Sequence, residues 1–589
     1  MCTKVCLFYI YLRYFSIFVK KIEVFKSVNI GKTWILFVFF ALSIFAKCIF
    51  FHYFCCDKPL QETVFAKLFP ALFFASFIFL FNKSKWTIIL SVIIDIWLVA
   101  ELIYFRANDF FLDEETILLI GNMNGFWNSI FTYLHWKFII FPVITIIYSL
   151  LCFLLPIERN VISFAIVMVL SLLSGVIDYF YGYSKDRSWA NNAFKVARLS
   201  TNGETWSVQW VYNHWVMAQT PLHFFFAYPY HELCKHIYKQ DNIDLSEQER
   251  QEVEELLSVP ETIEMKENLI LIIGESFESW AFEACDMSGE PIMKNCKKLM
   301  SKYNTLYADK ISPQIKAGTS GDGQLILTTG LLPISSGVAC MLYGDNEYPS
   351  FVKLYPNSYL INPCKNVWNQ TQVTKSYGYK TLIENERENW MTDEEVFTKA
   401  TECFSKQPFC LTLITIATHG PFEHSTKSTL QFSDDIHPKY ANYLKCMHYT
   451  DSCIGILLDK MEQDCLFKNT NIVITGDHTV FKSSMLKEFR ESTEKNNLPI
   501  PTDRSYCPLI LYSPSLHEKR QINDVCYQMD IYPTILHCIG ADKYSWKGFG
   551  INLMNDSVRN NRQSTDFTKS YLLSDKIIRG NFFLNEKGN

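Results

Sequence analysis

Glu275, Asp477 and His478 are residue types that bind divalent cations, and they follow short apolar runs of β-type residues. Two carboxylates and an imidazole form an oxygen and nitrogen ligand set that suits Zn²⁺ or Mn²⁺ better than Ca²⁺. His419 follows a third run of the same kind. Taken singly, each residue is typical of a solvated polar turn, and short motifs often match by chance. The repetition of the same design favours a shared site.

The three apolar runs predict strands that place these side chains at one edge of a sheet. The runs are Asn268–Ile273, Cys410–Ala417 and Asn471–Thr475. Short runs without polar alternation are typical of strands buried on both faces, as in a parallel sheet. Ligands of open α/β sheets bind in the crevice at the carboxyl ends of the strands. We therefore expect the metal-competent side chains to converge in that crevice.

Thr319 and Ser320 are candidate nucleophiles in the glycine-containing stretch Ile315–Gly330. Glycines between 318 and 323 indicate a tight loop, and the residues from Gln324 onward can enter a helix. The amino end of a helix favours an anion such as a phosphoryl oxygen. A divalent cation beside such a hydroxyl lowers its pKa and activates it as a nucleophile. The alternative is a helix N-cap, which is a common role of serine and threonine.

The first third of the 589-residue chain is strongly apolar and predicts a membrane domain. Hydrophobic residues make up 49% of the whole sequence and aromatic residues 15%. Five runs approach or reach the roughly 20 apolar residues that a membrane-spanning helix needs. They are Trp34–Phe54, Val64–Phe81, Trp86–Phe105, Phe138–Leu155 and Val161–Tyr181. The net charge of −5 and the lack of a Lys/Arg block argue against a nucleic-acid partner.

Charged residues around these runs indicate the orientation of the chain in the membrane. The segment before the first run is basic, Lys83 and Lys85 follow the second run, and acidic residues follow the third. Because cytoplasmic loops are enriched in Lys and Arg, this pattern places the amino terminus in the cytoplasm. Residues 1–31 lack a small-residue cleavage site and are interpreted as an uncleaved segment. Five crossings would then place everything after about residue 182 outside the cytoplasm.

The chain divides into four predicted parts. A five-helix transmembrane domain covers 1–183, and a linker rich in tryptophan and tyrosine covers 184–266. Residues 267–560 alternate strands with helical patterns, which predicts an α/β domain with a mostly parallel central sheet flanked by helices. Residues 561–589 are predicted to be a C-terminal tail.

Six motifs in this order resemble the lipoteichoic acid synthase type of polyglycerol-phosphate synthase. They are NLILIIGESFESW, GTSGDGQ, NVWNQ, ATHGPF, NIVITGDH and MDIYPTILHCIG. That family belongs to the alkaline phosphatase/sulfatase superfamily, and phosphoethanolamine transferases are its relatives. The resemblance covers nearly the whole chain. It implies a multi-pass protein of a bacterial-type plasma membrane with a sulfatase-like catalytic domain outside the cytoplasm.

The resemblance implies that Glu275, Thr319, Asp477 and His478 hold one divalent metal. Manganese is typical of the family, and zinc or magnesium are the alternatives. Thr319 would be the nucleophile that takes the phosphoryl group. The family shows Thr-Ser-Asp at this loop, whereas this chain reads Thr-Ser-Gly-Asp.

The resemblance also implies three residues that contact the substrate. His419 matches a histidine that contacts the substrate phosphate or the leaving group, and Trp368 matches a tryptophan of the headgroup pocket. Gln370 stands where the synthases have an arginine that grips glycerol phosphate. The loss of a guanidinium fork at a phosphate site is not a neutral change. This departure leaves the donor headgroup open.

These observations predict a metal-dependent phosphotransferase. It would move a phosphoglycerol or phosphoethanolamine headgroup from a membrane phospholipid, through a phospho-threonine intermediate, to an envelope lipid, glycan or polymer. Two alternatives remain at this point. The first is a phosphodiesterase, phosphatase or sulfuric ester hydrolase of the same superfamily, and the second is a catalytically inactive membrane protein that binds lipid or partners.

Overall fold

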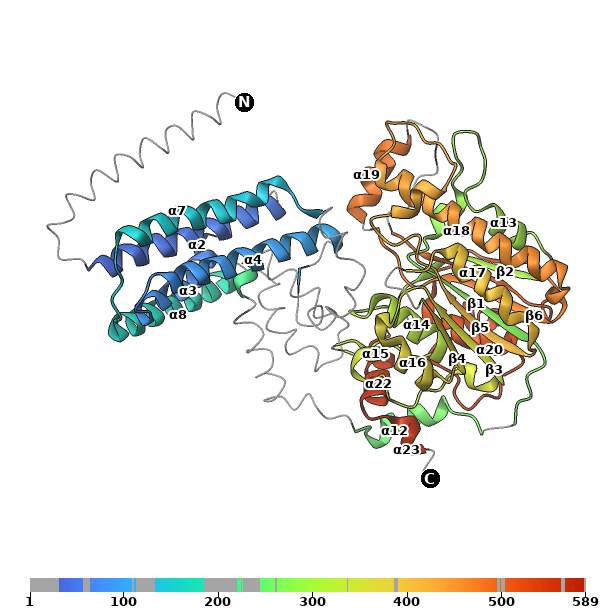
Figure 1. Ribbon diagram of the computed structural model, residues 1–589. Coiled ribbons are helices and arrows are strands. Elements are labelled where there is room, and N and C mark those ends of the chain that lie inside the picture. The colour runs from blue at the N-terminus through green and yellow to red at the C-terminus, as the bar shows by residue number, and fades with distance from the viewer. Residues whose placement is uncertain are drawn as a thin grey trace. The chain divides into compact units, whose positions relative to one another are not determined.

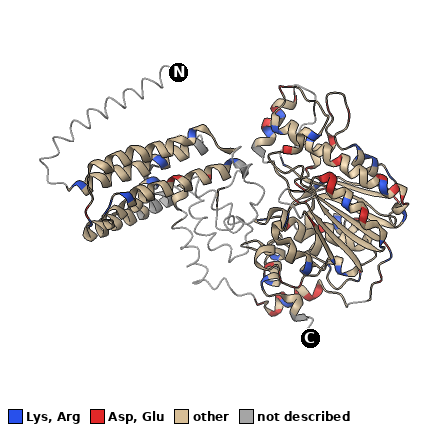
Figure 2. Cartoon of the chain, viewed as in Figure 1, with Lys and Arg blue, Asp and Glu red and all other residues tan. Residues whose placement is uncertain are grey.

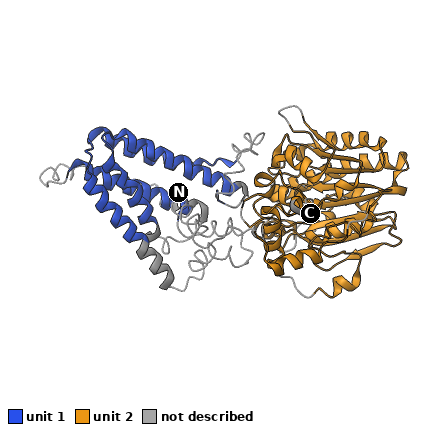
Figure 3. Ribbon diagram, turned by 90° about the horizontal axis from the view of Figure 1, so that it is seen from below, with its two compact units in different colours: residues 1–113, 132–197, 210–233 blue, residues 114–131, 198–209, 234–589 orange. Residues whose placement is uncertain are grey.

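The computed structural model contains two compact units, which are coloured separately in Figure 3. The described part of the first unit lies between residues 31 and 225, and that of the second begins at residue 244. The structure describes residues 31–56, 64–108, 111–112, 133–184, 220–223, 225, 244–259, 262–335, 337–385, 390–481, 483–494, 498, 504–562 and 567–586. The predicted amino-terminal segment and most of the predicted linker therefore lie outside the described residues.

The first unit is helical, and a helix forms at each of the five predicted apolar runs (Figure 1). Charged residues are sparse along these helices and frequent in the second unit (Figure 2). The bounds are α2 (Lys32–Cys56), α3 (Val64–Ser76) with η3 (Phe77–Leu80), α4 (Lys85–Asn108), η5 (Trp136–Ile139) with α7 (Ile140–Leu154), and α8 (Val161–Ser184), followed by η6 (Pro221–His223).

Three of these helices, and not five as predicted, are long and apolar enough to cross a membrane. The three spans are Lys32–Tyr53, Lys85–Arg106 and Trp136–Leu154. The other two apolar stretches, Lys67–Leu80 and Val161–Gly175, are shorter in the described part of the chain. A helix rises about 1.5 Å per residue, so Lys67–Leu80 falls short of a hydrocarbon core of about 30 Å. Val161–Gly175 is the fully described part of α8, which continues to Ser184. Among the described residues there are therefore three candidate spans and not the five that were predicted.

A buried ion pair joins three helices of the first unit. Lys47 of α2 lies 2.7 Å from Asp95 of α4 and donates hydrogen bonds of 2.7 Å to Ser91 and Thr145. Thr145 of α7 donates to the other carboxylate oxygen of Asp95 at 2.5 Å. The lysine is fully buried. Because a charge in an apolar interior is costly unless it is paired and hydrogen-bonded, this network fixes how α2, α4 and α7 pack.

The second unit is built on a nine-stranded, mostly parallel sheet, as the sequence predicts. The strand order is β4-β3-β5-β1-β6-β7-β2-β8, with β9 paired to β2, and β7 is antiparallel to both of its neighbours. The strands are β1 (Asn268–Gly274), β2 (Thr305–Ser312), β3 (Asn357–Asn362), β4 (Thr381–Glu384), β5 (Phe409–Ile414), β6 (Thr470–Gly476), β7 (Cys507–Tyr512), β8 (Arg520–Ile522) and β9 (Cys526–Tyr527).

The central strand β1 is buried on both faces, and its alternating side chains enter two separate cores. Leu269 and Leu271 pack into one core, whereas Ile270 and Ile272 pack into the other. The first core includes side chains of α12, α14, α20 and α22, and the second includes side chains of α13, α17 and α18. Helices thus cover both faces of the sheet (Figure 1), which is the layer arrangement expected of a parallel α/β domain.

The helices of the second unit connect the strands and continue past the last one. They are α12 (Glu247–Glu255), η7 (Ser279–Glu283), α13 (Lys294–Met300), α14 (Thr319–Thr329), α15 (Ala339–Leu342), η8 (Phe351–Leu354), η9 (Val367–Asn369), α16 (Gln370–Tyr377), α17 (Asp393–Glu402), η10 (Cys403–Ser405), η11 (Glu423–Lys427), α18 (Pro438–Gln463), η12 (Leu466–Asn469), α19 (Ser483–Thr493), η14 (Gln528–Asp530), α20 (Ile531–Cys538), α21 (Asp556–Asn560), α22 (Thr568–Arg579) and α23 (Phe582–Glu586).

Helices α22 and α23 lie in the stretch predicted to be a tail. Leu573, Ile577 and Phe582 of these helices are buried in the first core of the sheet. The described residues after 567 are therefore an integral part of the α/β unit.

Candidate active site

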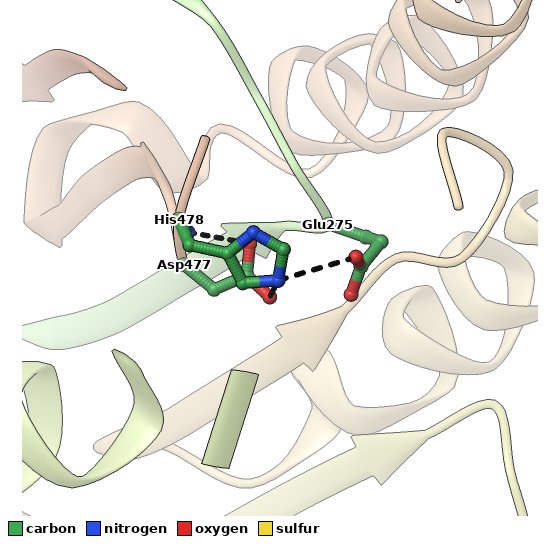
Figure 4. A group of neighbouring side chains, drawn as sticks. All are labelled: Glu275, Asp477 and His478. Carbon is green, nitrogen blue, oxygen red and sulfur yellow. Dashed lines mark hydrogen bonds and ion pairs between the residues drawn. The ribbon is translucent and has the colours of Figure 1, made fainter. Parts of the chain in front are cut away.

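The register of the sheet brings the predicted metal ligands together. β1 and β6 are parallel neighbours in which Gly274 pairs with Gly476. The next residue on each strand is Glu275 and Asp477, so the two carboxylates leave the sheet side by side at its carboxyl edge. Ligand atoms of Glu275, Asp477 and His478 lie within 4.8 Å of one another (Figure 4). The convergence expected from the apolar runs is present for these three residues.

Hydrogen bonds of the surrounding backbone orient the two carboxylates. Asp477 Oδ1 accepts from the backbone N–H of Ser276 at 2.8 Å and from that of His478 at 2.7 Å. Glu275 Oε1 accepts a hydrogen bond from the Ser276 hydroxyl at 2.9 Å. The backbone N–H of Glu275 donates to the Thr415 hydroxyl at 3.0 Å. Both carboxylates are at least 95% buried, because Glu275 is 5% exposed and Asp477 1%. Each acidic side chain is therefore held in one orientation.

The cluster fits a divalent cation. Asp477 Oδ2 is buried and makes no hydrogen bond. It lies 3.6 Å from His478 Nε2, which is also 3.6 Å from Glu275 Oε1. A buried carboxylate oxygen without a donor is costly unless a cation is present. Two carboxylates, one imidazole and a nearby hydroxyl provide oxygen and nitrogen ligands of the kind that Mn²⁺ and Zn²⁺ accept.

Burial and mutual charge control the protonation of this cluster. Burial raises the pKa of Asp477, and the negative charge of Glu275 raises it further. Burial alone would lower the pKa of His478, but the carboxylates of Asp477 and Glu275 outweigh it and raise that pKa. The concentration of negative charge in a dry site is typical of a cation-binding site.

The hydroxyl that joins the cluster is that of Ser320. Ser320 Oγ lies 3.2 Å from Glu275 Oε2, to which it donates, and 3.2 Å from His478 Nε2. Thr319, the predicted nucleophile and ligand, is the first residue of α14 and has a φ of 38°. Within the described part of the chain, no hydrogen bond connects the Thr319 hydroxyl to the three clustered side chains. The structure thus brings together three of the four predicted ligands.

Helix α14 begins earlier than predicted, and its glycines allow it to approach β6. It starts at Thr319 rather than at Gln324, so two of the loop glycines lie inside the helix. A Cβ on Gly323 would lie 2.7 Å from the backbone oxygen of Asp477. A Cβ on Gly321 would lie 3.1 Å from the ring of Trp368. The glycines are therefore needed for close packing and not for a turn before the helix.

Two acidic residues that were not predicted brace the loops of the site. Asp322 Oδ2 accepts from the backbone N–H of Lys316 and of Gly318, both at 2.9 Å, and burial raises its pKa to about 6. Glu278 Oε1 accepts from Val480 and Phe481 N–H, both at 2.8 Å, immediately after the Asp-His pair. The signal in the sequence was the second carboxylate of the motif GESFESW and the single carboxylate of GTSGDGQ.

The predicted substrate residues lie on loops around the same edge of the sheet. His419 follows β5, the other neighbour of β1, and its Nδ1 is 2.6 Å from the Gly420 carbonyl. Burial lowers the pKa of His419 and outweighs the hydrogen bond to the Gly420 carbonyl, which would raise that pKa. Trp390 packs against its ring edge to face, with centroids 6.1 Å apart. A neutral imidazole can both donate and accept a proton.

Trp368 and Gln370 flank the start of α14 from another loop. Trp368 has a φ of 57°, and its ring lies against Gly321, the residue after Ser320. Gln370 is 1% exposed and forms a reciprocal amide pair with Gln324, with N–O distances of 2.6 and 3.3 Å. The aromatic ring thus borders the site, whereas the Gln370 amide already has a partner in the protein.

Two family profiles match the chain, one for each unit. The profile described as Sulfatase matches residues 333–541, and the one described as Lipoteichoic acid synthase N-terminal domain matches residues 19–196. Among curated proteins, lipoteichoic acid synthase 1 of Bacillus subtilis (strain 168) is 25% identical over 335 residues, which are 53% of this chain and 52% of the relative. The lipoteichoic acid synthase of Staphylococcus saprophyticus is 26% identical over 348 residues, 54% of this chain and 52% of the relative. The chain spans about half the length of the curated relatives it matches.

Two solved structures match this chain at low sequence identity. The lipoteichoic acid synthase LtaP from Listeria monocytogenes has a TM-score of 0.47 and 18% identity, covering 57% of this chain and 98% of the other. The Streptococcus pyogenes phosphoglycerol transferase GacH, solved with sn-glycerol-1-phosphate, has a TM-score of 0.39 and 13% identity, covering 58% and 93%. Both scores are below 0.5, so the family assignment rests on the profiles and the curated relatives.

Proposed function

The chain is a lipoteichoic acid synthase-like member of the alkaline phosphatase/sulfatase superfamily, and on this premise we propose that it is a membrane-anchored phosphotransferase. It transfers the phospho-headgroup of a membrane phospholipid to a hydroxyl of an envelope lipid, glycan or polymer. The observation that carries the proposal is the buried cluster of Glu275, Asp477 and His478 with a hydroxyl of α14 in contact with it. That combination suits phosphoryl transfer through a covalent intermediate.

Glu275, Asp477 and His478 would hold a divalent cation together with that hydroxyl. When bound, the cation would lower the pKa of the hydroxyl and neutralise phosphoryl charge. Residues of the chain supply the nucleophile and bind the phosphoryl oxygens. A hydroxyl at the start of α14, where the sequence predicted Thr319, attacks the phosphorus of the donor, and the helix amino terminus favours the phosphoryl oxygens. Diacylglycerol leaves.

His419 is suited to move the proton in both half-reactions. Because its pKa is lowered by burial, the imidazole is largely neutral near pH 7 and can accept a proton. It takes the proton of the attacking α14 hydroxyl and, as its conjugate acid, gives that proton to the departing diacylglycerol oxygen. In the second half-reaction it takes the proton of the acceptor hydroxyl, which attacks the phosphorus, and gives it to the released side chain of the protein.

The membrane anchor would keep the protein at the membrane that contains its donor. The basic segment before the first apolar run and the two lysines after the second favour a cytoplasmic amino terminus, because cytoplasmic loops are enriched in Lys and Arg. Three spans and five spans are both odd numbers, so either topology puts the α/β unit outside the cytoplasm. A lipid headgroup can then reach the site from the outer face of the membrane, and Trp368 offers an aromatic surface to it.

The proposal is tested with the full chain in detergent and donors labelled on an acyl chain. Purified protein, stripped with EDTA and reloaded with Mn²⁺, is incubated with phosphatidylglycerol or phosphatidylethanolamine and a glycolipid acceptor. We expect labelled diacylglycerol together with an acceptor whose added mass identifies the headgroup. Release of free headgroup phosphate without modified acceptor would instead show a hydrolase.

Matched variants separate the metal cluster from general effects of charge. Asp477→Asn is expected to lose both stoichiometric metal and turnover, because it removes a buried charge that faces the cation site. Asp542→Asn alters an exposed carboxylate paired with His537 and is expected to behave as the wild type. Diacylglycerol formation at the wild-type rate by Asp477→Asn would contradict the proposal, as would failure of the metal-loaded wild type on every lipid donor.

A further inference from the structure

Two adjacent hydroxyls, Thr319 and Ser320, begin α14, and the one that contacts the metal cluster is that of Ser320. Ser320 Oγ lies 3.2 Å from Glu275 Oε2 and 3.2 Å from His478 Nε2. Within the described part of the chain, the Thr319 hydroxyl makes no hydrogen bond to these side chains.

The backbone before α14 fixes this choice. Thr319 has a φ of 38°, which is rare for a β-branched residue and is tolerated only where the surroundings impose it. The Thr319 N–H donates to the Lys316 carbonyl at 3.2 Å, and the Gly321 N–H donates to the Gly318 carbonyl at 2.7 Å. Asp322 holds the N–H groups of the same loop. The loop is therefore tied in a conformation that presents residue 320.

Close packing of α14 on β6 keeps that hydroxyl in reach of the cluster. Gly323 allows the helix to approach the backbone of Asp477, where any Cβ would lie 2.7 Å from the carbonyl oxygen. The orphaned Asp477 Oδ2 belongs to the same cluster and is buried. A hydroxyl, a carboxylate oxygen without a donor and two further ligand groups thus meet around one point.

The spacing within the motif agrees with the geometry. In the family motif Thr-Ser-Asp, the threonine lies two residues before the aspartate. In this chain the residue two positions before Asp322 is Ser320 and not Thr319. Matching the motif on its aspartate, whose carboxylate braces the loop, places serine at the position of the nucleophile.

We propose that Ser320, rather than Thr319, is the nucleophile that carries the phospho-headgroup in this protein. The inference rests on the proposed phosphotransferase function and specifies its covalent step. A bond forms between Ser320 Oγ and the donor phosphorus, and the bond from phosphorus to the diacylglycerol oxygen breaks. The serine proton passes to the neutral His419 imidazole, which gives it to the departing diacylglycerol oxygen, and the proton of the acceptor hydroxyl passes back to Ser320 by the same route when the acceptor oxygen displaces the serine.

Peptide mapping of the trapped intermediate tests the assignment. The full chain, loaded with Mn²⁺, is incubated with phosphatidylglycerol or phosphatidylethanolamine in the absence of acceptor and quenched in acid. Fragment-ion mass spectrometry of the peptide that contains both hydroxyls locates the added mass on one of them. We expect it on Ser320.

Variants at the two positions keep the test decisive. Ser320→Ala is expected to lose the adduct and about 1,000-fold or more in turnover, while Ser320→Thr regains an adduct at position 320. Thr319→Gly, which accepts the positive φ, is expected to carry the adduct on Ser320. Metal content and melting temperature of each variant show whether the fold is intact.

The possible outcomes separate this inference from the proposed function. An adduct on Thr319, or an adduct that persists in Ser320→Ala, overturns the assignment of the nucleophile and leaves the phosphotransferase proposal standing. Metal-loaded wild-type protein that forms neither adduct nor diacylglycerol from any donor overturns the proposed function itself and the inference with it.

Discussion

Gln370 is the residue whose surroundings say most about the donor pocket. An arginine at this position would present a charged fork to a phosphate, whereas the Gln370 amide is buried and paired with Gln324. Both side chains satisfy each other and carry no charge. The pair therefore supports the loop between β3 and α16 and does not serve as a charged grip on the headgroup.

Gln370→Leu is expected to lower the stability of the protein and to change the KM for the donor little. The substitution leaves the buried Gln324 amide without its partner, which costs about 1–3 kcal/mol. The double variant Gln324→Leu/Gln370→Leu removes both polar groups and is expected to recover part of that loss. Thermal melting and KM for the lipid donor are measured on the same preparations. A large rise in KM with an unchanged melting temperature would show instead that Gln370 contacts the substrate.

Sequence patterns predicted the two carboxylates and the imidazole of the site, but not which hydroxyl contacts them. Glu275, Asp477 and His478 could be predicted because each directly follows a strand, and strand register in a parallel sheet decides which of them become neighbours. The choice between Thr319 and Ser320 could not be made from their order alone. It depends on a backbone torsion and on the phase of a helix that begins five residues earlier than expected.

At the scale of elements, the Lys47–Asp95 network ties together α2, α4 and α7. Lys47→Met is expected to destabilise the helical unit by about 3–5 kcal/mol, because it leaves the Asp95 carboxylate buried without its cation. The double variant Lys47→Met/Asp95→Leu is expected to be more stable than Lys47→Met alone. Lys83→Met, in the exposed loop before α4, is the matched control. Unfolding in mixed micelles, followed by circular dichroism, measures the difference, and equal stability of Lys47→Met and Lys83→Met would refute a structural role of the pair.

Helix α12 is tied to α22 by an ion pair with a defined pH dependence. Lys576 donates to both carboxylate oxygens of Glu249, at 2.8 and 2.7 Å. Burial would raise the pKa of Glu249, but the hydrogen bonds from Lys576 and Ser246 outweigh it and lower that pKa below its ordinary value of 4.5. A lowered pKa in the folded state gives stability that is present above about pH 4.5 and is lost as the pH falls further.

Lys576→Gln is therefore expected to melt below the wild type at pH 7, by about 1–2 °C for a partly exposed pair. The difference should shrink toward zero as the pH falls below 4.5, because Glu249 becomes protonated in both proteins. Lys406→Gln, at an exposed position, corrects for the general effect of losing a positive charge. A difference that stays constant from pH 7 to pH 3.5 would contradict the assigned ion pair.

The positions of the helices in the first unit were predicted correctly, whereas the number of spans and the structure of the C-terminal segment were not. Apolar length alone located all five membrane-unit helices, but among the described residues three of them, and not five, are long and apolar enough to span a membrane. Residues 561–589 were predicted to be a C-terminal tail. Leu573 and Ile577 are nevertheless spaced for one helical face and are buried in the first core of the sheet.

At the scale of the whole molecule, the two units have separate hydrophobic cores, and the metal cluster lies entirely in the second. A ligand that binds only the folded α/β unit should stabilise that unit alone. This separation makes metal binding measurable without any assay of turnover, and independently of which headgroup the protein uses.

Calorimetry of the detergent-solubilised full chain is expected to show metal-dependent stabilisation confined to the α/β unit. Free Mn²⁺ at about 100 times its Kd should add about 2.7 kcal/mol to that unit and leave the helical unit unchanged. EDTA should reverse the effect, and Asp477→Asn should abolish it because the variant lacks the carboxylate oxygen that faces the site. Asp542→Asn should respond as the wild type does. Stabilisation of both units to the same extent, or an undiminished response of Asp477→Asn, would mean that the cation acts at the surface and that the buried cluster does not hold it.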